Sequence, residues 1–190
     1  MDLKHIKKLI GGPFELIADS LSEIVNDLDI DKTAKVLDLG TGRGMMAIIL
    51  ALNEYHVLTG EPKEDKTMYA KKDWYGNAQK AEVANLISFK HFEVEKLPFE
   101  NESFDAIFTY GSFHHFRDKK IALKESLRVL KHDGILCIIE PGPEMIKNIQ
   151  KRVGNHPDVE DPRNYLDDLS VRIEKIKDSQ LIDAYRIVKK

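Results

Sequence analysis

The chain of 190 residues contains very little cysteine: Cys137 is its single thiol. One thiol cannot form an intramolecular disulfide, so we expect the chain to fold in a reducing compartment. Residues 1–8 are charged and mixed, without the apolar core of a signal peptide. No stretch approaches the ~20 apolar residues that a helix needs to span a bilayer. We therefore predict a cytoplasmic protein without a membrane segment.

The sequence also lacks an excess of positive charge. It has 29 Lys and Arg against 32 Asp and Glu, a formal net charge of −3. Nucleic-acid binding normally requires a clustered basic patch. The short run of Lys4, Lys7 and Lys8 is better explained as a solvated helix face. We therefore expect no nucleic-acid partner.

Internal repeats and low-complexity segments are absent as well, and the length suits one domain with a full core. We expect a single domain over residues 1–190. In it, residues 1–30 form N-terminal helices, residues 35–140 form the core, and residues 141–190 form a helix, a loop and a terminal β-hairpin.

Short apolar runs alternate with helical patterns along the chain. The expected strands are 35–39, 56–60, 87–92, 104–109, 135–139, 171–177 and 181–188. The expected helices are 14–28, 45–52, 65–74, 78–84, a helix from the cap Asp118 to the stop Gly134, and 144–153, with a break at residues 76–77. This alternation predicts an α/β protein with a doubly wound parallel sheet.

The last two expected strands are separated only by residues 178–180. This gap is too short for a crossover helix, so the pair should form an antiparallel hairpin. The fold class that we predict is therefore a seven-stranded, mostly parallel sheet with a C-terminal antiparallel β-hairpin.

A glycine-rich segment, GTGRG at residues 40–44, follows the first expected strand. Glycine permits a sharp turn and close approach of the backbone to a ligand, and the next helix offers free N–H groups. A turn without any ligand would use the same residues. Dinucleotide sites require the spacing G-x-G-x-x-G. Here Met45 stands where that pattern needs its third glycine, so a nicotinamide-dependent oxidoreductase is the weaker alternative.

Residues 36–44, VLDLGTGRG, resemble the first motif of the class I S-adenosylmethionine-dependent methyltransferases. The resemblance extends over about residues 35–140. It includes the segment EVEKLPF at 93–99, the strand and following segment at 103–116, and residues 123–134. It implies a Rossmann-like fold, S-adenosyl-L-methionine as the cofactor, and methyl transfer to a small molecule, as in the quinone-biosynthesis branch.

The same resemblance assigns residues to the cofactor. Asp38 would lie near its ammonium group, and the loop residues would contact its amino-acid tail and ribose; these are Gly40, Thr41, Gly42 and Gly44. Glu61 follows the second expected strand, where an acid can bind ribose hydroxyls. Pro62 would pack on the adenine. A surface carboxylate at a turn is the alternative for Glu61.

The adenine amino group would meet Glu93, with Val94 beside it, although the family usually has the shorter aspartate at this position. Tyr110 and Gly111 follow the fourth strand and would lie near the transferred methyl group. Tyr110 could equally belong to the core.

Two adjacent histidines, His114 and His115, are the candidates for a general base. The resemblance favours His115, and packing or capping is the alternative role for both. We expect no metal, because adjacent side chains point in different directions and no Cys/His cluster supports the pair.

Acceptor specificity should reside outside the sheet, in residues 1–18 and 142–169. An apolar stripe in the first segment, from Leu3 to Ile10, could close over the site as a lid or pack on the sheet. We expect no added domain for a polymer, which favours a small-molecule acceptor. A protein that binds S-adenosylmethionine without catalysis remains a further alternative.

Overall fold

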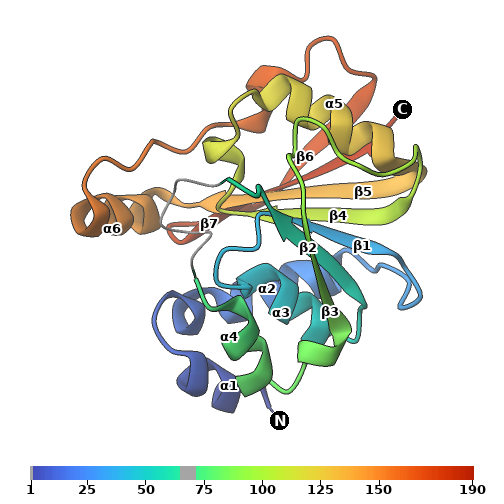
Figure 1. The fold of residues 1–190 in the computed structure, drawn as a ribbon. Coiled ribbons are helices and arrows are strands. Elements are labelled where there is room, and N and C mark those ends of the chain that lie inside the picture. Colours follow the sequence, from blue (N-terminus) through green and yellow to red (C-terminus); the bar gives the residue numbers. More distant parts are fainter. Residues whose placement is uncertain (1, 65–71) are drawn as a thin grey trace. The chain divides into compact units, whose positions relative to one another are not determined.

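The computed structural model describes residues 2–64 and 72–190, which form two compact units, Met1–Glu93 and Val94–Lys190 (Figure 1). Each unit is described by itself. Most of the helix expected at 65–74 lies outside the described residues. None of the described helices is long and apolar enough to cross a bilayer.

In the described part of the first unit, three parallel strands lie in the order β3-β2-β1. Their bounds are β1 (Val36–Leu39), β2 (Val57–Glu61) and β3 (Ile87–His91). In the register, Val57 of β2 lies between Val36 and Ile87. All of β1 is buried, as expected for a short apolar strand covered on both faces.

The helices of this unit are α1 (Leu3–Ile10), α2 (Pro13–Asp27), α3 (Met45–Leu52) and α4 (Trp74–Lys80). The helical spacing predicted for α2 is confirmed, because its apolar positions are buried; they are Phe14, Ile17, Leu21, Ile24 and the cap residue Leu28. The predicted α3 is confirmed at both ends, and its apolar side chains are buried on nearly all sides. Helix α2 contacts both α1 and α3.

The break predicted at residues 76–77 is wrong, because α4 continues through them. The side chain of Asp73 caps this helix by accepting a hydrogen bond of 2.7 Å from the N–H of Gly76. A Cβ at position 76 would lie 2.1 Å from that carboxylate. Gly76 therefore allows the cap to form, whereas glycine within a pattern ordinarily suggests an interruption.

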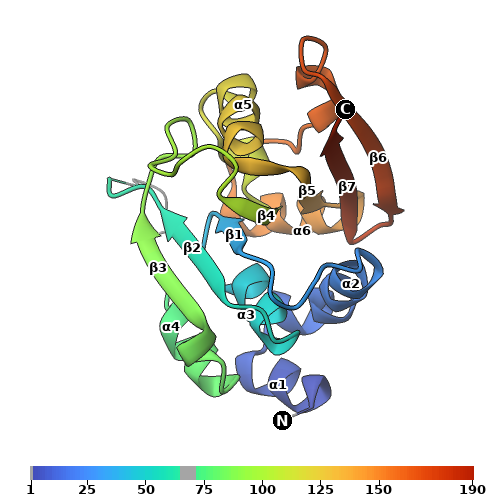
Figure 2. The ribbon, with the colours of Figure 1, turned by 90° about the vertical axis from the view of Figure 1, so that its right-hand side faces the viewer.

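The second unit contains four strands in the order β4-β5-β7-β6. Their bounds are β4 (Phe104–Tyr110), β5 (Leu130–Pro141), β6 (Val171–Asp178) and β7 (Ile182–Lys189). Strands β4 and β5 are parallel, while β7 runs antiparallel to both β5 and β6. Figure 2 shows β6 and β7 side by side, so the predicted terminal hairpin is confirmed.

The α-helices of the second unit are α5 (Lys119–Val129) and α6 (Pro143–Val153), and α5 packs on β5 (Figure 1). Short 3₁₀ turns occupy Phe113–His115 (η2) and Pro162–Tyr165 (η3). The predicted cap at Asp118 is confirmed, because its Oδ1 accepts a hydrogen bond of 2.9 Å from the N–H of Ile121.

The predicted helix stop at Gly134 is wrong. Helix α5 ends at Val129, and β5 begins at the next residue and contains Gly134. A Cβ at Gly134 would lie 2.7 Å from Cδ1 of Leu130 and 2.8 Å from the carbonyl oxygen of Asp105. This glycine therefore serves the close approach of β4 and β5, beside a shift in their register.

Candidate functional site

The glycine loop leaves β1 at the carboxyl end of the parallel strands. The N–H groups of Gly40 and Thr41 both donate to the carbonyl of Gly60 in β2, at 3.1 and 3.3 Å. Gly42 has φ +51° and Gly44 has φ +78°, which are left-handed conformations that glycine adopts without strain. A Cβ built at Gly42 would meet no heavy atom of the described residues within 4 Å, so open space adjoins the loop in that part of the chain.

Glu61, the last residue of β2, contacts this loop directly. Its Oε1 accepts a hydrogen bond of 2.5 Å from the N–H of Gly42. Glu61 and the following Pro62 are both half-buried. The structure therefore brings the predicted ribose-binding acid and the predicted loop together, within one unit.

Asp38 lies at the base of the loop and is fully buried. Its Oδ2 accepts a hydrogen bond of 2.8 Å from the Thr59 hydroxyl, which lies 2.8 Å from the hydroxyl of Thr41. Its Oδ1 is buried and has no hydrogen-bond partner in the described part of the chain. The pKa of Asp38 is raised to about 7, mainly by burial; the charge of Glu61 also raises it, while the Thr59 hydrogen bond lowers it.

Thr59 is a site residue that the sequence analysis missed. It stands in β2 two positions before Glu61, so both side chains lie on the same face of the strand. It is fully buried. A buried hydroxyl in this strand needs a partner, and that requirement is the signal that could have identified it.

Glu93 and Val94 fall on either side of the boundary between the two units. Glu93 is exposed and Val94 is buried. Their predicted contact with the adenine stays a prediction.

In the second unit, Tyr110 ends β4 and is followed by Gly111, which has φ +62° and donates a hydrogen bond of 2.8 Å to the carbonyl of Ile139. Burial raises the pKa of Tyr110 above its ordinary value, and the nearby Glu140 raises it further. The turn at Gly111 leads directly into η2, which carries both candidate histidines.

His114 is buried and pairs with Glu140 of β5 through its Nδ1 atom and the Oε2 atom of the carboxylate. Its Nε2 is also buried, without a hydrogen-bond partner among the described residues. Burial is the main cause that raises the pKa of Glu140 and lowers the pKa of His114. A histidine held at one nitrogen by a carboxylate presents the other nitrogen for proton transfer or for coordination.

His115 is exposed, and its ring centroid lies 4.1 Å from that of His114. A third histidine, His156, follows α6, and its ring lies 5.1 Å from His114 and 5.0 Å from His115. Each ring offers one nitrogen within 4.8 Å of the others. The expectation that no further residue supports the histidine pair was therefore wrong, because the chain beyond α6 returns to η2.

Arg128 in α5 explains part of the motif pattern that the sequence analysis quoted. Its guanidinium donates to the carbonyls of Leu97 and Phe99, at 2.9 and 2.8 Å. Glu125 accepts from the same guanidinium and from the N–H of Leu97, at 2.8 and 2.9 Å. The Leu-Pro-Phe segment is thus fastened to α5, which gives these residues a structural role.

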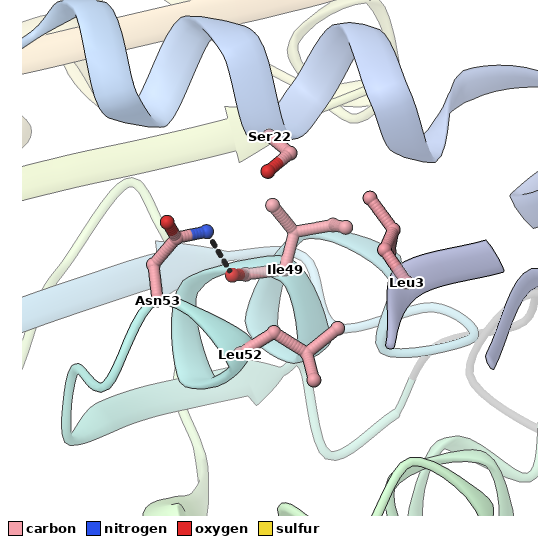
Figure 3. Close-up of a pocket in the computed structure, with 5 residues that line it drawn as sticks. All are labelled: Leu3, Ser22, Ile49, Leu52 and Asn53. Atoms are coloured by element: carbon pink, nitrogen blue, oxygen red, sulfur yellow. Dashed lines mark hydrogen bonds between the residues drawn. The ribbon is translucent and has the colours of Figure 1, made fainter. Parts of the chain in front are cut away.

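A pocket in the first unit lies away from these features. Figure 3 shows it between α1, α2 and α3. Its volume is about 130 Å³. Its lining consists of Leu3, Ser22, Ile49, Leu52 and Asn53. None of the predicted site residues lines it, and none of its five lining residues is titratable.

Helix α1 makes its main contacts with other helices. Ile6 of α1 is fully buried, and α1 packs against α2 and α4. Lys7 forms an ion pair with Asp19 of α2. Packing on the helices is thus observed for α1, and a lid formed by residues 1–18 stays a prediction.

Comparison with known proteins finds a family match that includes both the glycine loop and the histidine pair. Residues 37–138 match the family described as "Methyltransferase domain". The 27-O-demethylrifamycin SV methyltransferase of Amycolatopsis mediterranei is 28% identical over 123 residues, covering 63% of this chain and 44% of the relative. The demethylmenaquinone methyltransferase of Thermotoga maritima is 32% identical over 120 residues, covering 63% of this chain and 48% of the relative. The chain thus spans less than half of the length of these curated relatives.

A solved structure described as a SAM-dependent methyltransferase from Aquifex aeolicus superposes with a TM-score of 0.68 at 19% identity, covering 99% of both chains. This likeness shows the fold. The predicted α/β class, a Rossmann-like, seven-stranded and mostly parallel sheet with a C-terminal antiparallel hairpin, is confirmed.

Proposed function

The chain belongs to the methyltransferase domain family, and from this premise we propose that it is an S-adenosyl-L-methionine-dependent methyltransferase acting on a small molecule. One observation carries the proposal: Glu61, the glycine loop and the buried Oδ1 of Asp38 lie together at the carboxyl end of β1 and β2, and that oxygen has no hydrogen-bond partner among residues 2–64 and 72–190. Ligands of parallel α/β sheets bind at this edge.

The donor set suits this cofactor. The buried Oδ1 of Asp38 would accept a hydrogen bond from the ammonium group, and the open side of Gly42 would leave room for the amino-acid tail and ribose. Glu61 would accept hydrogen bonds from the ribose hydroxyls, while its Oε1 accepts the N–H of Gly42 in the loop. Pro62, Glu93 and Val94 are proposed for the adenine, and Tyr110 and Gly111 for the methyl end. When bound, S-adenosylmethionine supplies a methyl group that its sulfonium already activates.

The protein's own contribution to transfer is alignment and, for an acceptor that carries a proton, its removal. We propose His114 as the base, since Glu140 holds its Nδ1 and leaves Nε2 to receive the proton. His115 was the sequence-based preference. Its exposed position makes it the second candidate.

We propose a small molecule as the acceptor. We also propose that residues 1–190 act as a single methyltransferase domain. The named relatives act on a rifamycin and on demethylmenaquinone, and the net charge of −3 gives no field that would attract nucleic acid. The single cysteine supports a reducing, cytoplasmic location.

Calorimetry with S-adenosylmethionine and S-adenosylhomocysteine tests the proposal, with a parallel fluorescence titration of NADH. We expect binding of both sulfur ligands and none of NADH. No binding at millimolar ligand overturns the cofactor assignment, and saturable NADH binding would favour the oxidoreductase. A panel of hydroxylated aromatics, amines and thiols with methyl-labelled cofactor then tests transfer. Binding without any transfer would favour a non-catalytic protein.

With an acceptor found, the base can be tested directly. His114→Gln should lower kcat by about 10²- to 10⁴-fold without changing cofactor affinity, while His115→Gln should leave kcat within a few-fold. The opposite pattern would assign the base to His115.

A further inference from the structure

We propose that His114, His115 and His156 form a binding site for a zinc ion, with the fourth coordination position open. The three residues come from two separate segments of the second unit: η2, which follows β4, and the loop that follows α6. The site goes beyond methyl transfer, because its formation requires neither cofactor nor acceptor.

The spacing of the ligand atoms suits one metal ion. One nitrogen from each ring lies within 4.8 Å of the other two. Tetrahedral coordination with Zn–N bonds of 2.0–2.1 Å places nitrogens about 3.4 Å apart, so small side-chain rotations bring the three into range. Three imidazoles with one open position are a known zinc arrangement, and the neutral nitrogen ligand suits this borderline-soft ion.

Two of the rings are already oriented for coordination. Nδ1 of His114 lies against the carboxylate of Glu140, and Nδ1 of His156 donates to the carbonyl of Pro157 at 2.8 Å. Each contact leaves Nε2 as the coordinating nitrogen. Metal-bound histidines in proteins almost always have their second nitrogen held by a carboxylate or carbonyl in this way.

The buried nitrogen of His114 is the independent sign of a ligand. Its Nε2 has no hydrogen-bond partner in the described ranges, although the side chain is only 1% exposed. Burying an unpartnered polar atom costs free energy. A metal ion at this position would satisfy that nitrogen.

The loop that carries His156 is fastened close to η2. Gln150 of α6 donates a hydrogen bond of 2.7 Å to Asp158. Glu160 pairs with Lys119 of α5 at 3.0 Å and accepts a hydrogen bond from Tyr165, whose ring packs edge-on against Phe113 at 5.9 Å. These contacts hold the loop that carries His156 close to η2. Zinc binding therefore does not require this loop to move in from solvent.

Zinc and proton compete for Nε2 of His114. A chain with zinc bound cannot use that nitrogen as a base, so zinc should inhibit any methyl transfer in which His114 removes the acceptor proton. The zinc-binding test needs no acceptor, so its failure and the failure of the proposed function can be told apart.

The experiment measures Zn²⁺ binding to the full chain after chelator treatment, by competition with a chromogenic chelator. We expect one Zn²⁺ per chain. His156→Gln and His115→Gln should each weaken binding at least ten-fold, while His132→Gln, at an exposed histidine 69% accessible in β5, should leave it unchanged. Circular dichroism and thermal unfolding without metal confirm that each variant is folded.

Substitution with Co²⁺ provides a second measurement. The intense visible bands of tetrahedral Co²⁺ should appear with the wild-type chain and His132→Gln, and should be lost in His156→Gln. Binding that His156→Gln leaves unchanged, or a stoichiometry well below one, would overturn the site. The weak spectrum of a hexacoordinate ion in the wild-type chain would overturn the tetrahedral geometry and with it the proposal.

Discussion

The backbone N–H of Gly42 donates a hydrogen bond of 2.5 Å to Oε1 of Glu61, which ties the end of β2 to the glycine loop that leaves β1. Nineteen positions separate the two residues in the chain. Parallel pairing of β1 with β2 places their carboxyl ends side by side and makes the contact possible.

Removal of this carboxylate should weaken cofactor binding. Glu61→Ala is expected to cost about 1–3 kcal/mol of binding free energy for S-adenosylmethionine, because the ribose hydroxyls lose a charged acceptor. Calorimetry measures the change. Glu64→Ala, at an exposed acid in the turn after β2, should bind as the wild type does. Equal affinities for all three proteins would mean that Glu61 does not contact the cofactor.

The raised pKa of Asp38 makes stability depend on pH. Its pKa is about 7 in the folded chain, compared with an ordinary value of 3.8. The folded state therefore retains this proton longer than the unfolded state, and stability falls as pH rises from about 4 to about 7.

Asp38→Asn removes this dependence, since the amide has nothing to ionise. Between pH 5 and pH 8 the variant should gain about 2–3 kcal/mol of unfolding free energy relative to the wild type. Urea unfolding at the two pH values measures both proteins. If the difference in unfolding free energy between the two proteins is the same at both pH values, Asp38 has an ordinary pKa in the folded chain.

Ionisation of Asp38 should affect cofactor affinity in the opposite sense to stability: affinity should increase as the pH rises. The ammonium group of S-adenosylmethionine is best bound by ionised Asp38, so the Kd should fall about ten-fold from pH 6 to pH 8 as the carboxyl loses its proton. Asp38→Asn should not show this change, and any titration of the ligand itself will appear equally in both proteins. Parallel pH profiles would remove Asp38 from the ammonium site.

The buried pair of His114 and Glu140 should be important for stability. His114→Ala leaves the buried carboxyl group of Glu140 without its hydrogen-bond partner, a change that typically costs about 1–3 kcal/mol. His115→Ala removes an exposed ring and should stay within about 0.5 kcal/mol. Urea unfolding in the presence of a chelator excludes any contribution from metal. Similar losses for both variants would contradict the assigned difference in burial.

Arg128 should stabilise the second unit through its fork of donors. Arg128→Lys cannot reach the carbonyls of Leu97 and Phe99 together, so we expect a loss of about 1–3 kcal/mol in unfolding free energy. Arg117→Lys is the matched control at an exposed position and should be neutral. An unfolding midpoint that is the same for both variants would mean that the fork is not a significant contact.

The sequence by itself determined the order and type of most elements, because that information is local. Apolar spacing identified α2 and α3, and the three-residue gap before β7 predicted the hairpin. The loop at Gly40–Gly44 and the acid at Glu61 could also be identified, since glycine spacing and strand ends can be recognised from the sequence alone. The predictions from Gly76 and Gly134 were wrong, because glycine can permit close packing inside a helix or strand as well as end one.

Only the tertiary structure decided which distant groups meet. The partners of Asp38 through Thr59, and of His114 through Glu140, depend on which strands pair and on which face each side chain lies. His156 joins the other two histidines because the loop after α6 folds back to η2. No local pattern encodes such a return of the chain, since it follows from the packing of whole elements.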